Sequence, residues 1–145
     1  MREIKFKLWD KNNLDWIGES AARIDGDGRP WTHELSSGDF ILNIHVAPVF
    51  WTGLKDKNGV EIYEGDIVRY QYREKKLSNH QQLCTVIYKP EAAAFLLAAS
   101  YYEPQVKYLG DIAKAGKDYE VRTYELCEVI GNIYENQELL KGLTK

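Results

Sequence analysis

The chain has 145 residues, the usual length of one domain, and can bury a sizeable core without disulfides or metals. Apolar residues make up 44% and charged residues 28% of it, which excludes an intrinsically disordered chain. The formal net charge of −3 excludes a global positive field, so nucleic-acid binding would need a local basic patch. Ten tyrosines and four tryptophans favour a strand-rich fold.

The two cysteines, Cys84 and Cys127, form no metal or redox motif. We therefore expect reduced, partly buried thiols in a cytosolic protein. The first residues lack the apolar stretch of a signal peptide. The longest apolar run, residues 92–99, is far shorter than the roughly 20 residues that span a bilayer. These features predict a protein of the cytoplasm that does not bind membranes.

The first third of the chain predicts short strands joined by loops. Apolar and polar side chains alternate over residues 4–9, which is typical of a strand, and a polar turn at 10–13 lets 14–17 return as a hairpin. Residues 18–39 are punctuated by glycine, proline and aspartate and predict loops, with a short strand at 21–24. An apolar run predicts a further strand over 40–46, ended by Pro48.

The centre of the chain gives the clearest pattern. Residues 49–52 predict a strand, and Asn58-Gly59 predicts a type I′ turn because both residues tolerate positive φ. A second turn at 64–66 leads into a strand over 67–72, followed by a polar loop over 73–79.

The next strand, 82–88, places Cys84, Val86 and Tyr88 on one face. Residues 92–102 fit either a helix or, better, a strand–turn–strand path after a turn at Pro90.

The last third of the chain gives a weaker pattern. Residues 103–120 predict an irregular or weakly helical segment, and 121–134 predict strands with a bulge or bend at Gly131. Asn136 is placed to cap a final helix over 137–141 by accepting a backbone N–H bond.

No motif in the chain predicts catalysis, a cofactor or a metal. Residues 25–28 are similar to the start of a calcium loop, but the later ligand positions hold arginine, proline and serine. Residues 110–117 are similar to a phosphate loop, but the glycine spacing is wrong and Asp118 follows the lysine. The three histidines are scattered, and no nucleophile motif is present.

One basic and aromatic cluster has two interpretations. Its rings could stack on bases while its cations meet phosphates, or its tyrosines could pack in the core of a half-buried strand. The cluster consists of Arg69, Tyr70, Tyr72, Arg73, Lys75 and Lys76.

Three segments, residues 1–10, 52–68 and 128–136 continued by 138–140, resemble the YopX-like family encoded by phages and prophages. The resemblance implies a β-rich core like an SH3-type barrel, additional elements and homo-oligomeric association. It transfers no catalytic residue. The matching segments contain turn and close-approach residues that specify the fold. These are Gly53, Asn58, Gly59, Gly65, Asp66 and Gly131.

We therefore predict a single, mainly β domain over 1–145. It has an N-terminal hairpin and variable loops over 1–48, a small SH3-like barrel over 49–136 and a short helix and tail over 137–145. The tryptophans at 9, 16, 31 and 51 exceed what one small core readily hides, which favours exposed rings.

The predicted function is that of a non-enzymatic phage or prophage accessory protein acting through protein–protein contacts. The expected partners are further copies of the chain, as a homo-oligomer, or a phage or host protein in the bacterial cytoplasm. The alternative is nucleic-acid binding through the cluster at 69–76. Candidate oligomer contacts are the rings of the variable segments, Trp31, Phe40, Tyr101, Tyr102 and Tyr108.

Overall fold

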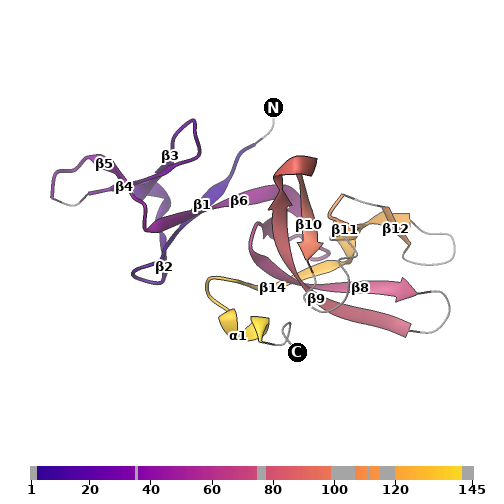
Figure 1. The fold of residues 1–145 in the computed structure, drawn as a ribbon. Helices are drawn as coiled ribbons and strands as arrows, with labels where there is room; N and C mark the ends of the chain where they lie inside the picture. Colours follow the sequence, from indigo (N-terminus) through magenta and orange to yellow (C-terminus); the bar gives the residue numbers. More distant parts are fainter. Residues whose placement is uncertain are drawn as a thin grey trace. The chain divides into compact units, whose positions relative to one another are not determined.

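The structure, a computed structural model, describes residues 3–34, 36–74, 78–98, 107–110, 112–114 and 120–141. The chain forms two compact units, Met1–Trp51 and Thr52–Lys145 (Figure 1). Strands dominate, and the described residues contain one short α-helix, α1 (Gln137–Leu140). The predicted mainly β fold with a short C-terminal helix is confirmed. The division of a single domain at 48/49 and 136/137 remains a prediction.

The first unit begins with the predicted hairpin. Strands β1 (Phe6–Asp10) and β2 (Asp15–Ile17) pair antiparallel, with Trp9 opposite Trp16 and their rings edge to face at 4.9 Å. The Asp10 carboxylate closes the turn because it accepts the backbone N–H groups two and three residues further on. These hydrogen bonds lower the pKa of Asp10.

A small three-stranded sheet follows a single 3₁₀ turn, η1 (Glu19–Ala21). Its order is β3-β4-β5, and both pairs are antiparallel. The predicted strand at 21–24 is confirmed, but the prediction of loop over the rest of 18–39 missed β4, whose proline start gives it a turn-like sequence. The strands are β3 (Ala22–Ile24), β4 (Pro30–His33) and β5 (Phe40–Leu42).

The prediction that Pro48 ends a strand is wrong. Strand β5 ends at Leu42, and a new strand, β6 (Val46–Lys55), runs through Pro48. Hydrogen-bonded and non-hydrogen-bonded residue pairs alternate along an antiparallel ladder. Because hydrogen bonds are seen at both ends of the β1–β6 ladder, this alternation makes Leu8 and Pro48 a non-hydrogen-bonded pair. The proline nitrogen therefore points away from β1, and no ladder bond is lost.

The hairpin between β6 and β7 (Glu61–Tyr63) turns at the predicted place but with a different geometry. The Gly59 N–H donates to the Asp56 carbonyl at 3.0 Å, and Gly59 has a φ of +82°. Asn58 does not have a positive φ. The loop therefore contains three residues with a single left-handed glycine, not the predicted two-residue type I′ turn.

The Asp56 carboxylate ties this loop to a distant strand. It is 6% exposed, and Oδ1 accepts the N–H groups of Asn58 and Val60 at 2.8 and 2.9 Å. Oδ2 accepts the N–H of Val129, 73 positions away, at 2.9 Å. Beside it, the Lys57 N–H donates to the Cys127 carbonyl at 3.0 Å.

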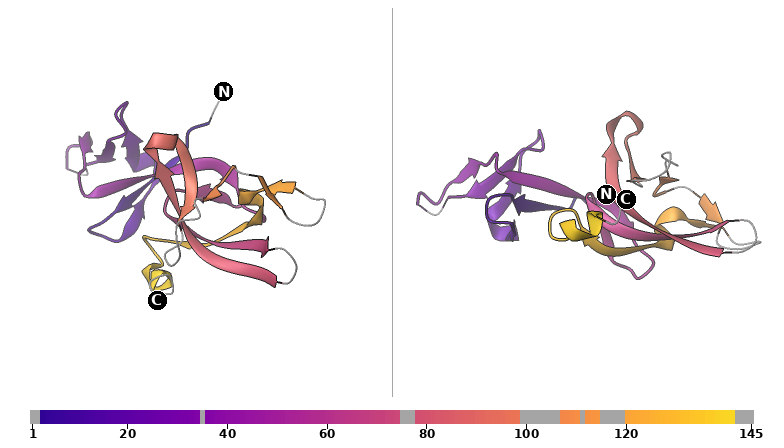
Figure 2. Two further views of the ribbon diagram at one scale, coloured as in Figure 1. Left: turned by 45° about the vertical axis from the view of Figure 1, so that its right-hand side comes forward. Right: turned by 60° about the horizontal axis from the view of Figure 1, so that its bottom comes forward.

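The second unit is built on a five-stranded antiparallel sheet in the order β11-β10-β9-β8-β14, which curls into a half-barrel (Figures 1 and 2). A short β12–β13 ribbon accompanies it. The sheet consists of β8 (Asp66–Glu74), β9 (Ser78–Lys89), β10 (Ala94–Ala98), β11 (Lys107–Tyr108) and β14 (Cys127–Asn132). The other elements are η2 (Pro90–Ala92), β12 (Ile112–Lys114), β13 (Glu120–Arg122) and η3 (Thr123–Leu126).

Two predicted loop regions contain strands. The β8–β9 ladder continues as far as Glu74 opposite Ser78, so most of the predicted polar loop 73–79 is paired backbone. Within 103–120, the described residues form short strands and no helix. Over 73–79, backbone pairing through polar residues leaves no hydrophobic pattern in the sequence, which explains the first of these errors. Within 92–102, residues 94–98 form a strand after η2 and not a helix, which agrees with the first strand of the preferred alternative. Residues 99–102 lie outside the described residues.

The core of the second unit lies on one face of this sheet. Val68 lies opposite Cys84, and Tyr70 lies opposite Cys127, so these four side chains share a face. Of the three residues predicted to share one face of β9, Cys84 and Val86 are buried, whereas Tyr88 is 42% exposed. The buried cluster comprises Ile62, Val68, Tyr70, Cys84, Val86, Leu97, Leu109 and Cys127.

Gly65 has a φ of +85° in the turn between β7 and β8, a conformation that favours glycine. Its N–H donates to the Val86 carbonyl at 2.8 Å, and its carbonyl accepts the Ile133 N–H at 2.9 Å. Asp66 completes this turn by accepting the Tyr63 N–H at 2.8 Å. The predicted turn at 64–66 is confirmed.

A glycine is required at position 131 because the Asn136 side chain lies close to its backbone. The β8–β14 register shifts between Val129 and Gly131, which confirms the predicted irregularity. A Cβ on Gly131 would lie 2.6 Å from the Asn136 Oδ1. That oxygen accepts the Asn132 N–H at 3.1 Å instead of capping α1, so the predicted capping role of the Asn136 side chain is wrong.

We predict that Asp56→Asn lowers the free energy of unfolding by about 3 kcal/mol, because the amide cannot satisfy all three N–H groups. Urea denaturation would measure the loss. Glu19→Gln makes the same charge change at an exposed position and should shift stability by less than about 0.5 kcal/mol. Equal stability of Asp56→Asn and the parent would contradict the assigned role of the carboxylate.

We also predict that both native thiols are unreactive in the folded protein. Burial raises the pKa of Cys84 to about 11 and, with nearby charges, that of Cys127 to about 12. At pH 8, Ellman's reagent should therefore label both thiols at least ~100-fold more slowly in the native protein than in urea. Fast labelling of either thiol in the native protein would contradict the described core.

Candidate functional site

The three-stranded sheet of the first unit presents two different faces. Arg23, Trp31 and Leu42 lie directly opposite one another across β3, β4 and β5, and therefore share one face. On the other face, the buried Thr32 lies opposite Ile41. Strand β5 is an edge of this sheet, since β4 is its only strand neighbour among the described residues.

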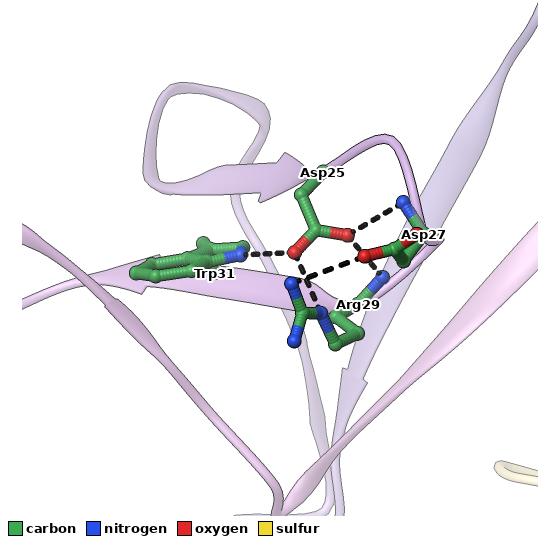
Figure 3. A network of polar contacts seen from close by, with 4 residues as sticks. All are labelled: Asp25, Asp27, Arg29 and Trp31. Carbon is green, nitrogen blue, oxygen red and sulfur yellow. Dashed lines mark hydrogen bonds and ion pairs between the residues drawn. The ribbon is translucent and has the colours of Figure 1, made fainter.

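An aspartate-centred network fixes the β3–β4 turn (Figure 3). The Asp25 Oδ2 accepts the Trp31 indole N–H at 3.0 Å and the Arg29 Nε–H at 2.8 Å. Its Oδ1 accepts the backbone N–H groups of Asp27 and Arg29 at 3.0 and 2.9 Å. The indole bond, followed by the Arg29 bonds, holds the pKa of Asp25 at about 2. The similarity to a calcium loop thus reflects a structural turn.

A cation and two rings extend the same face towards the edge strand. The Arg23 guanidinium lies 3.7 Å from the centre of the Phe40 ring, a cation–π contact that spans β4. The His33 ring meets Phe40 edge to face at 5.5 Å. Phe40 is half-buried by these neighbours, so the sheet face is ordered by side-chain contacts of its own.

Exposed apolar side chains gather on and beside β5. Ile41 and Leu42 are each 42% exposed, and Ile44, just after the strand, is 77% exposed. Large apolar groups in water are unfavourable, and their concentration at one place is typical of a contact surface. We call Ile41, Leu42 and Ile44 the β5 patch. Ile41 and Leu42 point to opposite faces of the sheet, so the patch follows the edge strand and does not lie on one face.

A family model described as YopX protein matches residues 5–141 of the chain. The chain belongs to the YopX family. This confirms the resemblance found in the three sequence segments.

Two similar proteins cover nearly the whole chain. One is the SPbeta prophage-derived uncharacterized protein YopX of Bacillus subtilis strain 168, 25% identical over 149 residues that cover 95% of this chain and 96% of that protein. The other is the crystal structure of protein EF1440 from Enterococcus faecalis, with 23% identity and a TM-score of 0.44 over 95% of this chain and 98% of that one.

The residues predicted as oligomer contacts lie in different places. Trp31 and Phe40 belong to the sheet that carries the β5 patch, and both are half-buried. Tyr108 lies in β11 of the second unit, and Tyr101 and Tyr102 fall outside the described residues. The assignment of these rings to subunit contacts remains a prediction.

The predicted excess of exposed tryptophans is wrong for Trp9, which is only 6% exposed. Trp16, Trp31 and Trp51 are half-buried. The Lys7 ammonium lies 5.6 Å from the centre of the Trp16 ring, and the Lys5 ammonium lies 4.6 Å from that of Trp51. Lysine side chains thus cover the rings of Trp16 and Trp51, and amino-acid composition alone does not reveal this covering.

The basic and aromatic cluster of β8 is divided by the fold. Tyr70 is 4% exposed and packs in the core, which leaves its ring unavailable for stacking on a base. Arg69 donates to Glu128 at 3.1 Å. Tyr72 and Arg73 lie in the strand, and Lys75 and Lys76 fall outside the described residues. Nucleic-acid binding through the cluster remains a prediction without support from Arg69 and Tyr70.

The described residues contain no group of three or more histidine, cysteine, aspartate or glutamate side chains placed to hold a metal ion. Within the same residues, no helix is long and apolar enough to cross a membrane.

Sequence reasoning missed the exposed members of the β5 patch. The run over 40–46 was correctly expected to contain a strand, but its apolar side chains gave no sign of which would face water. No local signal could have found them, since a short continuous apolar run is typical of a strand buried on both faces.

We predict that the Trp31 indole N–H resonance titrates with the Asp25 carboxyl at about pH 2. Because the folded pKa lies below the ordinary 3.8, the network stabilises the fold above that value and weakens as the pH falls towards 2. NMR from pH 6 downwards would follow the resonance, and Asp25→Asn should abolish the shift. A midpoint near pH 4 would contradict the network.

Proposed function

We propose that the chain is a prophage accessory protein that works through protein–protein contacts as a homo-oligomer in the bacterial cytoplasm, without catalysing a reaction. The prophage context is supported by the prophage origin of the similar protein from Bacillus subtilis. The contact function is supported by the surface of the first unit.

The distribution of exposed apolar groups carries this proposal. Among the described residues, five of the eight exposed large apolar side chains lie in the first unit, although the second unit is longer. Three of the five form the β5 patch, and the others are Ile4 and Leu14. Burying such side chains against a partner contributes about 1.5–3 kcal/mol each for complete burial.

The chemistry of the patch fits a protein partner better than a phosphate backbone. Its members are uncharged and aliphatic, and Asp39, an exposed carboxylate, directly precedes the strand. A carboxylate beside the patch would repel phosphates. Trp31 and Phe40 lie on the same face as Leu42 and add the aromatic character typical of interface cores.

We predict that the double variant Leu42→Lys and Ile44→Lys weakens self-association at least ~10-fold, because two ammonium groups would have to be desolvated in the contact. Sedimentation velocity over a range of concentrations would measure it. Both residues are exposed, so the variant should keep the circular dichroism spectrum of the parent.

The matched control is Val60→Lys with Ile87→Lys. These side chains are 47% and 40% exposed but belong to the second unit, outside the β5 patch. The control should assemble like the parent. A parent that stays monomeric at high concentration, or a patch variant that assembles as well as the parent, would refute the proposal.

A further inference from the structure

The backbone of β5 has one paired and one open side. The Asn43 N–H donates to the Pro30 carbonyl at 3.0 Å, and the Glu34 N–H donates to the Asp39 carbonyl at 2.8 Å. Hydrogen-bonded pairs alternate along an antiparallel ladder, so the pair between them, Ile41 opposite Thr32, is also hydrogen-bonded. The N–H and C=O groups of Phe40 and Leu42 therefore point away from β4.

Unlike β5, the edge strand β14 of the second unit's sheet is covered on its outer side. Strand β14 is also an edge strand, but the loop after β6 covers its outer side. The Val129 N–H is held by the Asp56 carboxylate, and the Cys127 carbonyl accepts the Lys57 N–H. Native sheets commonly protect edges by such coverage, by lysine, by proline or by bulges.

Strand β5 is protected by its short length of three residues, but not by a lysine, a proline or a bulge. Its sequence is Phe-Ile-Leu, and its pairing with β4 shows no register shift. Beyond β4, the described residues supply no strand neighbour on the outer side. An open, aliphatic edge is suited to binding another strand, whose main chain satisfies the outward groups while alternate side chains pack together.

We propose that β5 pairs antiparallel with β5 of a second copy of the chain, with the two Ile41 residues opposite each other. This inference rests on the proposed homo-oligomer and names its contact. In this register, Phe40 lies opposite Leu42 of the second copy, and Leu42 lies opposite Phe40 of the second copy. Both pairs join outward-pointing groups, so the two strands exchange four hydrogen bonds.

The symmetry of β5 favours this register over the one centred on Phe40. Its two outward-pointing residues flank Ile41 equally, so a two-fold axis through Ile41 matches both of them at once. Centring the pair on Phe40 would leave Leu42 opposite Gly38, outside the strand, and would place the Asp39 carboxylate opposite Ile41. The Ile41-centred register instead places Asp39 opposite the neutral Asn43.

Cysteine crosslinking tests the register. Residues in a central non-hydrogen-bonded pair have Cα atoms about 4.5 Å apart, within the range that a disulfide bridges. Ile41→Cys should therefore form a covalent dimer under mild oxidation with copper phenanthroline. The native thiols are 2% and 0% exposed, which keeps the background low.

Ile44→Cys is the matched control. Ile44 is more exposed than Ile41 but would lie opposite Gly38 of the second copy, with the two Ile44 residues about 20 Å apart. We expect at least ~5-fold more covalent dimer from Ile41→Cys than from Ile44→Cys. Equal yields, or no crosslink at Ile41 in a protein that self-associates, would overturn the strand pairing and leave the proposed homo-oligomer standing.

A proline substitution separates backbone pairing from side-chain packing. Leu42→Pro removes an outward N–H and spares the β4 ladder, since only Ile41 bonds to β4 within the strand. It should weaken dimerisation ~10-fold or more, whereas Leu42→Ala should weaken it less. An equal effect of the two variants would overturn the hydrogen-bonded edge, and a monomeric parent would overturn both this inference and the proposed function.

Discussion

The buried carboxylate of Asp56 is the interaction on which the second unit most depends. It shapes the loop after β6 through two backbone N–H groups and reaches a third on β14. One side chain thereby closes a hairpin, fixes the position of a distant strand and covers a sheet edge. A buried charge is tolerated here because hydrogen bonds replace the water it has lost.

Carboxylates at turns recur throughout the chain. Asp10 and Asp25 organise turns in the first unit, and Asp56 and Asp66 organise turns in the second. Three of them act within six residues along the sequence, and Asp56 alone also acts at long range. The aspartates that lie near glycine and asparagine in the sequence therefore serve to form turns. The similarity of one such segment to a calcium loop has the same cause.

Strands and turns that depend on neighbouring residues could be predicted from the sequence, whereas features that depend on distant strands could not. Alternation at 4–9 and the turn at 64–66 depend on neighbouring residues and were predicted correctly. The passage of β6 through Pro48 depends on which side of the strand β1 occupies, which no local pattern contains. Tyr70 lies between charged and polar neighbours in the sequence, yet its strand register directs it into the core. The exposed β5 patch escaped prediction for the same reason, because exposure is decided by strands elsewhere in the chain.

The long reach of Asp56 also bears on the order of folding. The β1–β2, β1–β6, β3–β4 and β4–β5 pairings all join residues of the first 51, so these pairings can form while synthesis continues. The loop after β6 reaches its final partner only once Val129 has left the ribosome, since 73 positions separate the two. Closing so long a loop costs entropy before any contact rewards it, which makes docking of β14 a late event. During translation, the first unit with its open β5 edge would therefore be folded before β14 docks in the second unit.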